Sequence, residues 1–344
     1  MIEPIPALLT VLGAGALLVV LLWPVHGLLW RVLGMTRATG RVQTEDALKH
    51  LYDCEYRTQP CTLQSLAGAL GLSGNRAVSL LERLEQHGLA RAEAGRYLLT
   101  SEGRGYALRV IRIHRLWERY LAEETGLEAP EWHAQAEIRE HRTTLEEAKA
   151  LAARMGFPRY DPHGDPIPTE TGEIAPARGC PVTDLAAGSS AEVVHVEDEP
   201  PAVYAQLVAE GLQQGSRVRV IESSPQRIRL ESDGDEHVLA PVVAANLSVV
   251  ELPEEEEPAG PVERLSSLAL GESARVKGIS AACRGPERRR MLDLGLVPGT
   301  LVEAEMKSPA GDPTAYRIRG AMIALRRSQA ELIHVERTAE GSAG

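Results

Sequence analysis

Apolar residues recur at helical spacing through the first half of the chain, and short strand-like segments separated by glycines dominate the second half. Repeats of three and four residues predict helices over 44–52, 62–71, 75–87, 102–124 and 131–155. Two short apolar runs, at 88–90 and 97–100, predict a pair of strands with Gly95 at the turn between them. The pattern therefore predicts a helical half followed by a β-rich half.

The order of the first elements describes a winged helix domain over residues 42–112. Thr44 is placed to cap the first helix, with Leu48 and Leu51 on its core side. The two middle helices, separated by a Gly-Leu-Ser-Gly turn, suit a helix-turn-helix. Their expected core positions are Leu63, Leu66, Ala67 and Leu70 on the first helix and Val78, Leu81 and Leu84 on the second. A helical block over 113–178 follows and ends at 161–168, where repeated prolines exclude a helix.

The second half contains an internal repeat. The pattern Leu-x2-Gly-x2-Ala-x-Val at 185–193 recurs at 268–276, and Gly-Leu-x2-Gly-x2-Val at 211–218 recurs at 295–302. The offsets of 83 and 84 residues are nearly equal. We therefore expect two copies of a small five-stranded barrel, over 181–252 and 262–337, joined by a charged, proline-bounded linker.

The N-terminal segment over residues 4–34 is predicted to be a transmembrane helix. No charged residue lies between Glu3 and Arg31, and the apolar stretch is long enough to cross a bilayer. A cleaved signal peptide would begin with a positive region, and this segment begins with Glu3. Because Arg31, Arg37 and Arg41 follow it, we expect a single-pass protein of the inner membrane with its later domains in the cytoplasm. The alternative is a buried helix or an interfacial hairpin.

The charge of the chain is unevenly distributed. The net charge is −11, but residues 62–115 hold eight arginines and only four acids, a local charge of +4. The acids gather elsewhere, notably at Glu254–Glu257. The four cysteines (Cys54, Cys61, Cys180 and Cys283) form no Cys-x2-Cys pair, so they give no zinc signature and no disulfide framework. We expect ordinary buried thiols in a reducing compartment.

Two groups of histidines and carboxylates stand out in the helical block. His133, Glu137, Glu140 and His141 fall on one face of a helix, and His114 and Glu118 lie one turn apart on the helix before it. Such a face is costly to bury unless a cation lies between its side chains. Nitrogen and carboxylate donors suit manganese or ferrous iron. The alternative, a solvated polar face, stays open on spacing alone.

These residues carry a resemblance to a known family. Residues 42–178 resemble the DtxR/MntR family of iron- or manganese-dependent transcriptional repressors, and both later repeats resemble FeoA-type, SH3-like barrels. The stretches that carry the likeness are Thr44–Leu48, the helix-turn-helix, Leu99-Thr100-x2-Gly103, His114-Arg115-Leu116-x-Glu118, His133-x3-Glu137-x2-Glu140-His141, Asp161–Pro168 and, in the second barrel, Arg288–Gly299 and Ala315–Gly320. The fold class this implies is α+β multidomain: a transmembrane helix, a winged helix-turn-helix, a helical dimerisation domain and two small SH3-like β-barrels.

The resemblance implies a set of metal ligands. The positions that match the family's primary site are Asp46, Glu137, Glu140 and His141, and those that match its neighbouring ligands are His114, Glu118 and His133. Iron-type members have Met and Cys where this chain has Asp46 and Glu137, so the cofactor implied is Mn²⁺ or Fe²⁺ with the manganese branch favoured. Lys49 replaces a family glutamate, which argues against a two-ion cluster of the manganese type. The segment 197–201 does not align with the ligands that the family's SH3-like domain donates.

The resemblance also implies a DNA-binding surface. The residues expected to reach bases from the second helix of the turn motif are Ser73, Asn75, Arg76 and Ser79. Arg91 and Arg96 on the wing, with Arg104, are expected to meet phosphates. Ser73 and Asn75 have an alternative role as helix caps. The family carries a small Thr or Ser pair where this chain has Arg76 and Val78, so the operator is expected to differ.

The function implied is that of a homodimeric, metal-dependent regulator that binds double-stranded DNA. A metal shared between Asp46 and the ligands of the helical block would favour the DNA-competent state, acting as a corepressor. No nucleophile–base pair, P-loop or dinucleotide motif is present, so an enzyme is not expected. The alternative is a membrane-anchored, FeoA-like partner of a ferrous-iron transporter, with the helix-turn-helix retained as a scaffold.

Overall fold

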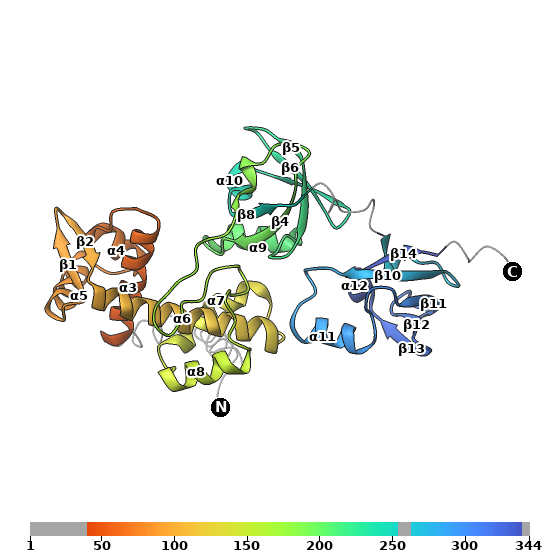
Figure 1. The fold of residues 1–344 in the computed structure, drawn as a ribbon, viewed down its shortest axis with the longest axis horizontal. Helices are drawn as coiled ribbons and strands as arrows, with labels where there is room; N and C mark the ends of the chain where they lie inside the picture. Colours follow the sequence, from red (N-terminus) through yellow and green to blue (C-terminus); the bar gives the residue numbers. More distant parts are fainter. Residues whose placement is uncertain (1–39, 254–262, 339–344) are drawn as a thin grey trace, which may run out of the picture. The chain divides into compact units, whose positions relative to one another are not determined.

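The computed structural model describes residues 40–253 and 263–338. The chain divides into two compact units, one up to Ile111 and one from Arg112 onward (Figure 1). Helix α6 (Ser101–Glu124) begins in the first unit and continues into the second.

The first unit is a winged helix domain. It comprises α3 (Gly40–Tyr56), α4 (Leu63–Ala69), α5 (Gly74–Gln86), the hairpin of β1 (Ala90–Glu93) and β2 (Arg96–Leu99), and the start of α6. The three helices and the strand pair predicted from the sequence are confirmed, with ends that shift by a few residues. Thr44 is not the cap of α3, since it lies inside the helix and its hydroxyl donates to the Gly40 carbonyl.

The core of this unit shows which apolar positions the pattern placed correctly. Leu48, Leu66 and Leu84 are fully buried, as predicted. Val78 is 39% exposed, and the buried stripe of α5 runs through Leu80 instead. A one-residue error in a 3.6-residue period moves a side chain by about 100° around the helix, which accounts for the wrong position.

Two local devices fix the joints of the unit. The Thr62 hydroxyl caps α4 by accepting from the backbone N–H of Ser65, and the Ser65 side chain accepts from the backbone N–H of Thr62. Gly103 lies against the Leu89 carbonyl, where an added Cβ would collide with backbone. The start of α6 therefore packs closely on the segment that leads into the wing.

The second unit begins with a helical part. It continues α6 and adds α7 (Ala129–Glu140) and α8 (Leu145–Arg154). The single helix predicted over 131–155 is two helices, because Thr144 caps α8 by accepting from the backbone N–H of Glu147. The proline-rich segment that follows folds back on itself, with a β-bridge between Tyr160 and Pro166.

Two antiparallel sheets of identical strand order complete the second unit. The first contains β3 (Cys180–Pro181), β4 (Ser190–Val196), β5 (Arg217–Ser223), β6 (Ile228–Ser232), β7 (Asp235–Leu239) and β8 (Leu247–Glu251), ordered β3-β8-β4-β5-β6-β7. The second contains β9 (Glu263–Arg264), β10 (Ser273–Ile279), β11 (Leu301–Lys307), β12 (Thr314–Ile318), β13 (Ala321–Leu325) and β14 (Ile333–Arg337), ordered β13-β12-β11-β10-β14-β9. Short helices α9 (Pro201–Ala209), α10 (Pro241–Ala244), α11 (Gly285–Asp293) and α12 (Arg327–Ala330), with 3₁₀ turns η1 (Val182–Asp184) and η3 (Leu265–Ser267), join the strands.

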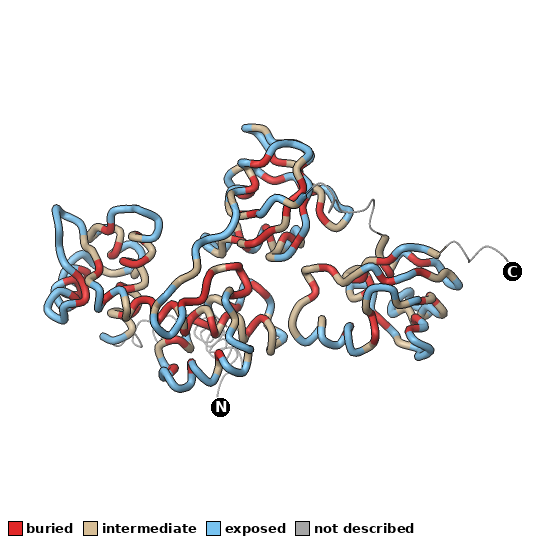
Figure 2. The backbone as a smooth tube through the Cα atoms, viewed as in Figure 1, coloured by how far each residue is buried: buried red, intermediate tan, exposed pale blue. Residues whose placement is uncertain are grey.

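The internal repeat is thus confirmed, although each copy has six paired strands where five were predicted. Register shifts fall at matching places, between Val193 and His195 in the first sheet and between Val276 and Gly278 in the second. Buried and exposed residues alternate along the strands, as in β5 (Figure 2).

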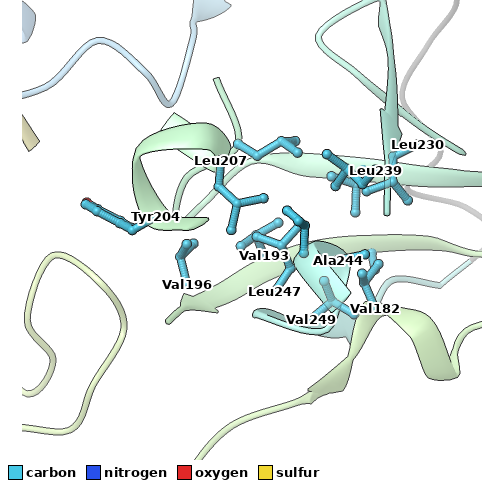
Figure 3. Close-up of a cluster of buried hydrophobic side chains, with 14 of the residues drawn as sticks. Val182, Val193, Val196, Tyr204, Leu207, Leu230, Leu239, Ala244, Leu247 and Val249 are labelled. Carbon is cyan, nitrogen blue, oxygen red and sulfur yellow. The ribbon is translucent and has the colours of Figure 1, made fainter. Parts of the chain in front are cut away.

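The core of the first sheet also takes in part of the helical block. Val193, Leu207, Leu230 and Leu247 meet inside the sheet (Figure 3). The same buried cluster includes Leu121 of α6 and Trp132 and Ala136 of α7. This shared core holds the first sheet against the helices that carry the candidate metal ligands.

The membrane predictions require correction. No helix within residues 40–253 and 263–338 is long and apolar enough to cross a membrane. The segment 4–34 and most of the predicted linker at 252–261 lie outside the described residues. The predicted fold class included a transmembrane helix, and the inner-membrane localisation was drawn from it. Both predictions are corrected: the described residues form an α+β fold that contains no such helix.

Candidate functional site

A cluster of imidazoles and carboxylates lies between α6 and α7 in the second unit. His114 and Glu118 are one turn apart on α6, so both face the same side of the helix. His133 lies on α7, and Glu140 is its last residue. His114, Glu118 and Glu140 are buried, with at most 6% of each residue exposed.

The ligand atoms of this cluster are close together. His114 Nε2 lies 3.0 Å from Glu118 Oε1 and 3.3 Å from His133 Nδ1, and its Nδ1 lies 2.5 Å from Glu140 Oε2. His133 Nδ1 lies 3.2 Å from Glu118 Oε1. His141 follows α7 with its Nε2 3.3 Å from Glu140 Oε1. Five of the seven predicted ligands therefore converge in this unit.

Two more residues join the cluster that the sequence did not reveal. Asp198, just before α9, lies with its Oδ2 2.9 Å from His133 Nδ1. His163, in the proline-rich segment, lies with its Nε2 3.8 Å from Glu118 Oε1. The ligand atoms of Glu118, His163 and Asp198 lie within 4.8 Å of one another, as do those of His114, Glu118 and His133. Glu118 is shared by both groups.

The segment that carries His163 is held by specific bonds. Asp161 Oδ1 accepts from the backbone N–H groups of His163, Gly164 and Asp165, at 2.8–2.9 Å. Gly164 has φ +104°, and an added Cβ would collide with the Val194 carbonyl. Arg115 on α6 pairs with Asp165 at 3.2 Å. These contacts fix His163 beside the cluster.

The charges of the cluster perturb its titrating groups. Burial alone would raise the pKa of Glu118, but His114, His133 and His163 outweigh it and lower that pKa well below its ordinary range. Burial disfavours the charged form of His133, yet Asp198 and Glu118 raise its pKa to about 11. The imidazoles therefore take the neutralising role that a divalent cation would otherwise fill.

The donor set fits a divalent cation. Both ring nitrogens of His163 are buried and have no hydrogen-bond partner among the described residues. A buried imidazole without a partner is costly unless it serves as a ligand. The cluster contains only nitrogen and oxygen donors, which suit manganese or ferrous iron.

Two predicted ligands are not among the residues that converge within the second unit. Glu137 is exposed on α7 and belongs to none of the ligand groups formed within the second unit. Asp46 lies on α3 in the first unit, where it is half-buried. The roles of Asp46 and Glu137 as ligands remain predictions from the resemblance.

The six predicted DNA-contacting residues are all exposed in the first unit. Ser73, Asn75, Arg76 and Ser79 are all exposed at the start of α5. Ser73 occupies the N-cap position but makes no side-chain cap bond, so its hydroxyl is not used by the helix. Arg91 and Arg96 are exposed on the wing. Arg104 instead pairs with Glu55 and lies over the ring of Tyr52.

Two known domain families together match most of the described chain. Residues 100–169 match the iron dependent repressor, metal binding and dimerisation domain. Residues 180–251 and 263–337 each match the FeoA domain. These matches cover the metal cluster and both sheets.

Individual relatives match between about half and three fifths of the chain. The chain is 31% identical over 222 residues to the iron-dependent repressor IdeR of Mycobacterium leprae (strain TN), covering 60% of this chain and 96% of that protein. It is 30% identical over 193 residues to the diphtheria toxin repressor of Corynebacterium glutamicum, covering 52% of this chain and 83% of that protein. A solved manganese-dependent transcriptional repressor in complex with manganese aligns with TM-score 0.56 and 29% identity, over 61% of this chain and all of that one.

These relatives decide between the classes of function considered from the sequence. All three are repressors by name, so the expectation that the chain is not an enzyme is confirmed. They give no support to the alternative of a membrane-anchored partner of a ferrous-iron transporter. The chain belongs to the DtxR/IdeR family of metal-dependent transcriptional repressors and carries two FeoA domains at its C-terminal end.

Proposed function

We propose that this protein is a transcriptional repressor whose binding to double-stranded DNA depends on Mn²⁺ or Fe²⁺. The observation that carries the proposal is the convergence of nitrogen and oxygen donors on the shared carboxylate of Glu118. The same chain carries the metal-binding domain of a repressor family and two FeoA domains.

The residues proposed to hold the ion are His114, Glu118, His133 and Glu140, with His141, His163 and Asp198 beside them. The ion would supply the positive charge that now comes from protonated imidazole. Because Asp198 belongs to the first FeoA domain and His114 to α6, these side chains connect the sheet to the long helix. Fixing them in one arrangement favours a single state of the second unit.

The residues proposed to bind DNA are those exposed at the start of α5 and on the wing. Arg76 is proposed to contact base or phosphate, and Asn75 and Ser79 base edges. Arg91 and Arg96 are proposed to contact phosphates, although Arg91 also lies 3.3 Å from Glu93. With two copies in a dimer, the basic surface doubles.

Dimerisation is proposed to involve the helical part of the second unit. Exposed apolar side chains gather in this part, namely Ile138, Leu145 and Phe157, each with more than half of its surface accessible. Single exposed apolar residues need no explanation, but three in a segment matched to a dimerisation domain fit a covered surface. We expect Ile138→Asp to shift the chain toward the monomer in sedimentation measurements.

The proposal is tested by measuring DNA binding. The full chain is mixed with labelled duplex from upstream of its own gene, with Mn²⁺, with anaerobic Fe²⁺ or with chelator, and fluorescence anisotropy is followed. We expect binding only with metal, and a fall of about 10- to 100-fold in affinity for Arg76→Ala, since one good base contact contributes about 1–3 kcal/mol. Arg178→Ala, outside the winged helix unit, is the matched control. Metal uptake without DNA binding under any condition would overturn the proposal.

A further inference from the structure

A second group of metal-ligating side chains lies in the first unit. His50 and Cys54 are one turn apart on α3, and Cys61 lies just before the cap of α4. Their ligand atoms, His50 Nε2 and the two Sγ atoms, lie within 4.8 Å of one another. Cys54 is 6% exposed and Cys61 2% exposed, so both sulfurs are shielded from solvent.

The distance between the imidazole nitrogen and one of the two sulfurs fits two ligands of a tetrahedral ion. Cys54 Sγ lies 3.6 Å from His50 Nε2. A zinc ion with ligands at about 2.05 Å for nitrogen and about 2.3 Å for sulfur would separate them by about 3.6 Å in tetrahedral geometry. Ser65 Oγ lies 3.2 Å from His50 Nε2 and 3.6 Å from Cys61 Sγ, near the place of a fourth ligand.

We propose that His50, Cys54 and Cys61 bind a thiophilic divalent cation, Zn²⁺, in a site distinct from the nitrogen–oxygen cluster of the second unit. Two sulfurs and one imidazole favour zinc over manganese, because soft thiolate donors select softer ions. The pattern His-x3-Cys-x6-Cys crosses the loop between two helices, which is why the absence of a Cys-x2-Cys pair did not exclude such a site.

The proposed ion would join the two helices that position the recognition helix. The backbone carbonyl of Cys61 also accepts from the N–H of Tyr97 on the wing, at 3.0 Å. A cation held by α3 and by Cys61 therefore ties α3, the start of α4 and the wing strand β2 together. Its expected effect is a zinc-dependent rise in the thermal midpoint of the full chain.

The test uses Co²⁺ as a spectroscopic probe of the full chain, stripped of metal and kept reduced without oxygen. Only thiolate ligands give the near-ultraviolet sulfur-to-cobalt charge-transfer band, and the cluster of the second unit contains no sulfur. We expect the band to saturate as Co²⁺ is added and to disappear when Zn²⁺ is added. Cys54→Ser and Cys61→Ser are expected to abolish it, and Cys180→Ser and Cys283→Ser to retain it.

His50→Gln provides a variant that leaves both sulfurs in place. We expect it to weaken the affinity of the site for Co²⁺ by at least about tenfold. Removing a residue that only supports a ligand already lowers metal affinity by about 10- to 100-fold, so removing a ligand should cost at least as much. A wild-type chain without the band would overturn the proposal, as would a band that survives Cys54→Ser.

Discussion

The two FeoA domains share a sheet but differ in the segment that joins their second strand to the following helix. In the first, Asp198 lies three residues before α9 and reaches His133 at 2.9 Å. In the second, Ala282 occupies the same place, three residues before α11. Strand order and the first register shift are the same. The sheet therefore acts as a scaffold, and in the first domain the connecting segment supplies a candidate ligand through Asp198.

The second domain contacts its neighbours in a different way. Arg284 donates to the carbonyl of Pro162 at 3.0 Å and to that of Gln214 at 2.6 Å. Pro162 precedes His163, so this guanidinium supports the segment that holds a candidate ligand without being one itself. The first domain contributes a candidate ligand, Asp198, to the cluster. The second domain contributes a hydrogen bond from Arg284 that holds the segment carrying His163.

The largest effect on Mn²⁺ affinity is expected at Glu118, the carboxylate on α6 that lies close to ligand atoms of both the helices and the first FeoA domain. Glu118 belongs to both ligand groups, so Glu118→Gln removes the carboxylate that they share. We expect the affinity for Mn²⁺, measured by calorimetry on the full chain, to fall by more than about 100-fold, beyond the usual cost of losing an outer-shell partner. Glu146→Gln, at an exposed position on α8, is the matched control. An unchanged affinity in Glu118→Gln would remove the cluster from the account.

A direct exchange between the domains tests the comparison itself. Asp198→Ala gives the first domain the residue of the second, and we expect about a 10- to 100-fold loss of Mn²⁺ affinity. Ala282→Asp makes the reverse change and is expected to leave that affinity unaltered, because the second domain reaches the neighbouring segment through Arg284 and the Pro162 carbonyl and not through Ala282. Equal effects of the two substitutions would show that the position does not distinguish the domains.

The pH dependence of ion binding is expected to be smaller. With its pKa raised to about 11, His133 keeps a proton that Mn²⁺ must displace, so the affinity should rise by up to about tenfold per pH unit between pH 7 and 8. In the metal-free chain the sign is opposite. The raised pKa contributes stability that is fully present below about pH 6.5 and lost as the pH rises through about 11. Calorimetry in buffers of different ionisation enthalpy measures the released proton, and Asp198→Asn should reduce it.

The smallest effect on ion binding is expected from the second domain. Arg284→Ala leaves two carbonyls without their charged donor, so we expect the free energy of unfolding in urea to fall by about 2 kcal/mol. The Mn²⁺ affinity should change by less than about threefold. Arg289→Ala, which removes an exposed ion pair with Glu124, is the control. A loss of ion affinity as large as that of Asp198→Ala would erase the distinction between support and ligand.

Local patterns revealed much of this architecture from the sequence. The spacing of His114 and Glu118 placed both on one face of α6, and the glycine pattern disclosed the duplicated sheets. Thr144 shows the limit of periodicity, since its cap divides a helix that the apolar pattern ran through. Val78 shows a second limit, because a shift of one residue exchanges a core position for a surface one.

The missing parts of the site come from long-range contacts. His163 reaches the cluster because Asp161 folds its segment, and Asp198 because the first sheet shares a core with α6 and α7. Cys54 and Cys61 come together across the loop between α3 and α4. No periodic signal links residues that are joined by loops or by a separate sheet, so these neighbours required the fold.

The central claim is that an ion bound by the cluster of the second unit turns on DNA binding. Its most direct test is an anisotropy titration in which Mn²⁺ is added to the full chain with labelled upstream duplex, for the wild type and for His114→Ala. We expect DNA affinity to rise by at least about tenfold with saturating Mn²⁺, and His114→Ala to lose this rise. DNA binding of equal strength in chelator and in Mn²⁺ would contradict it.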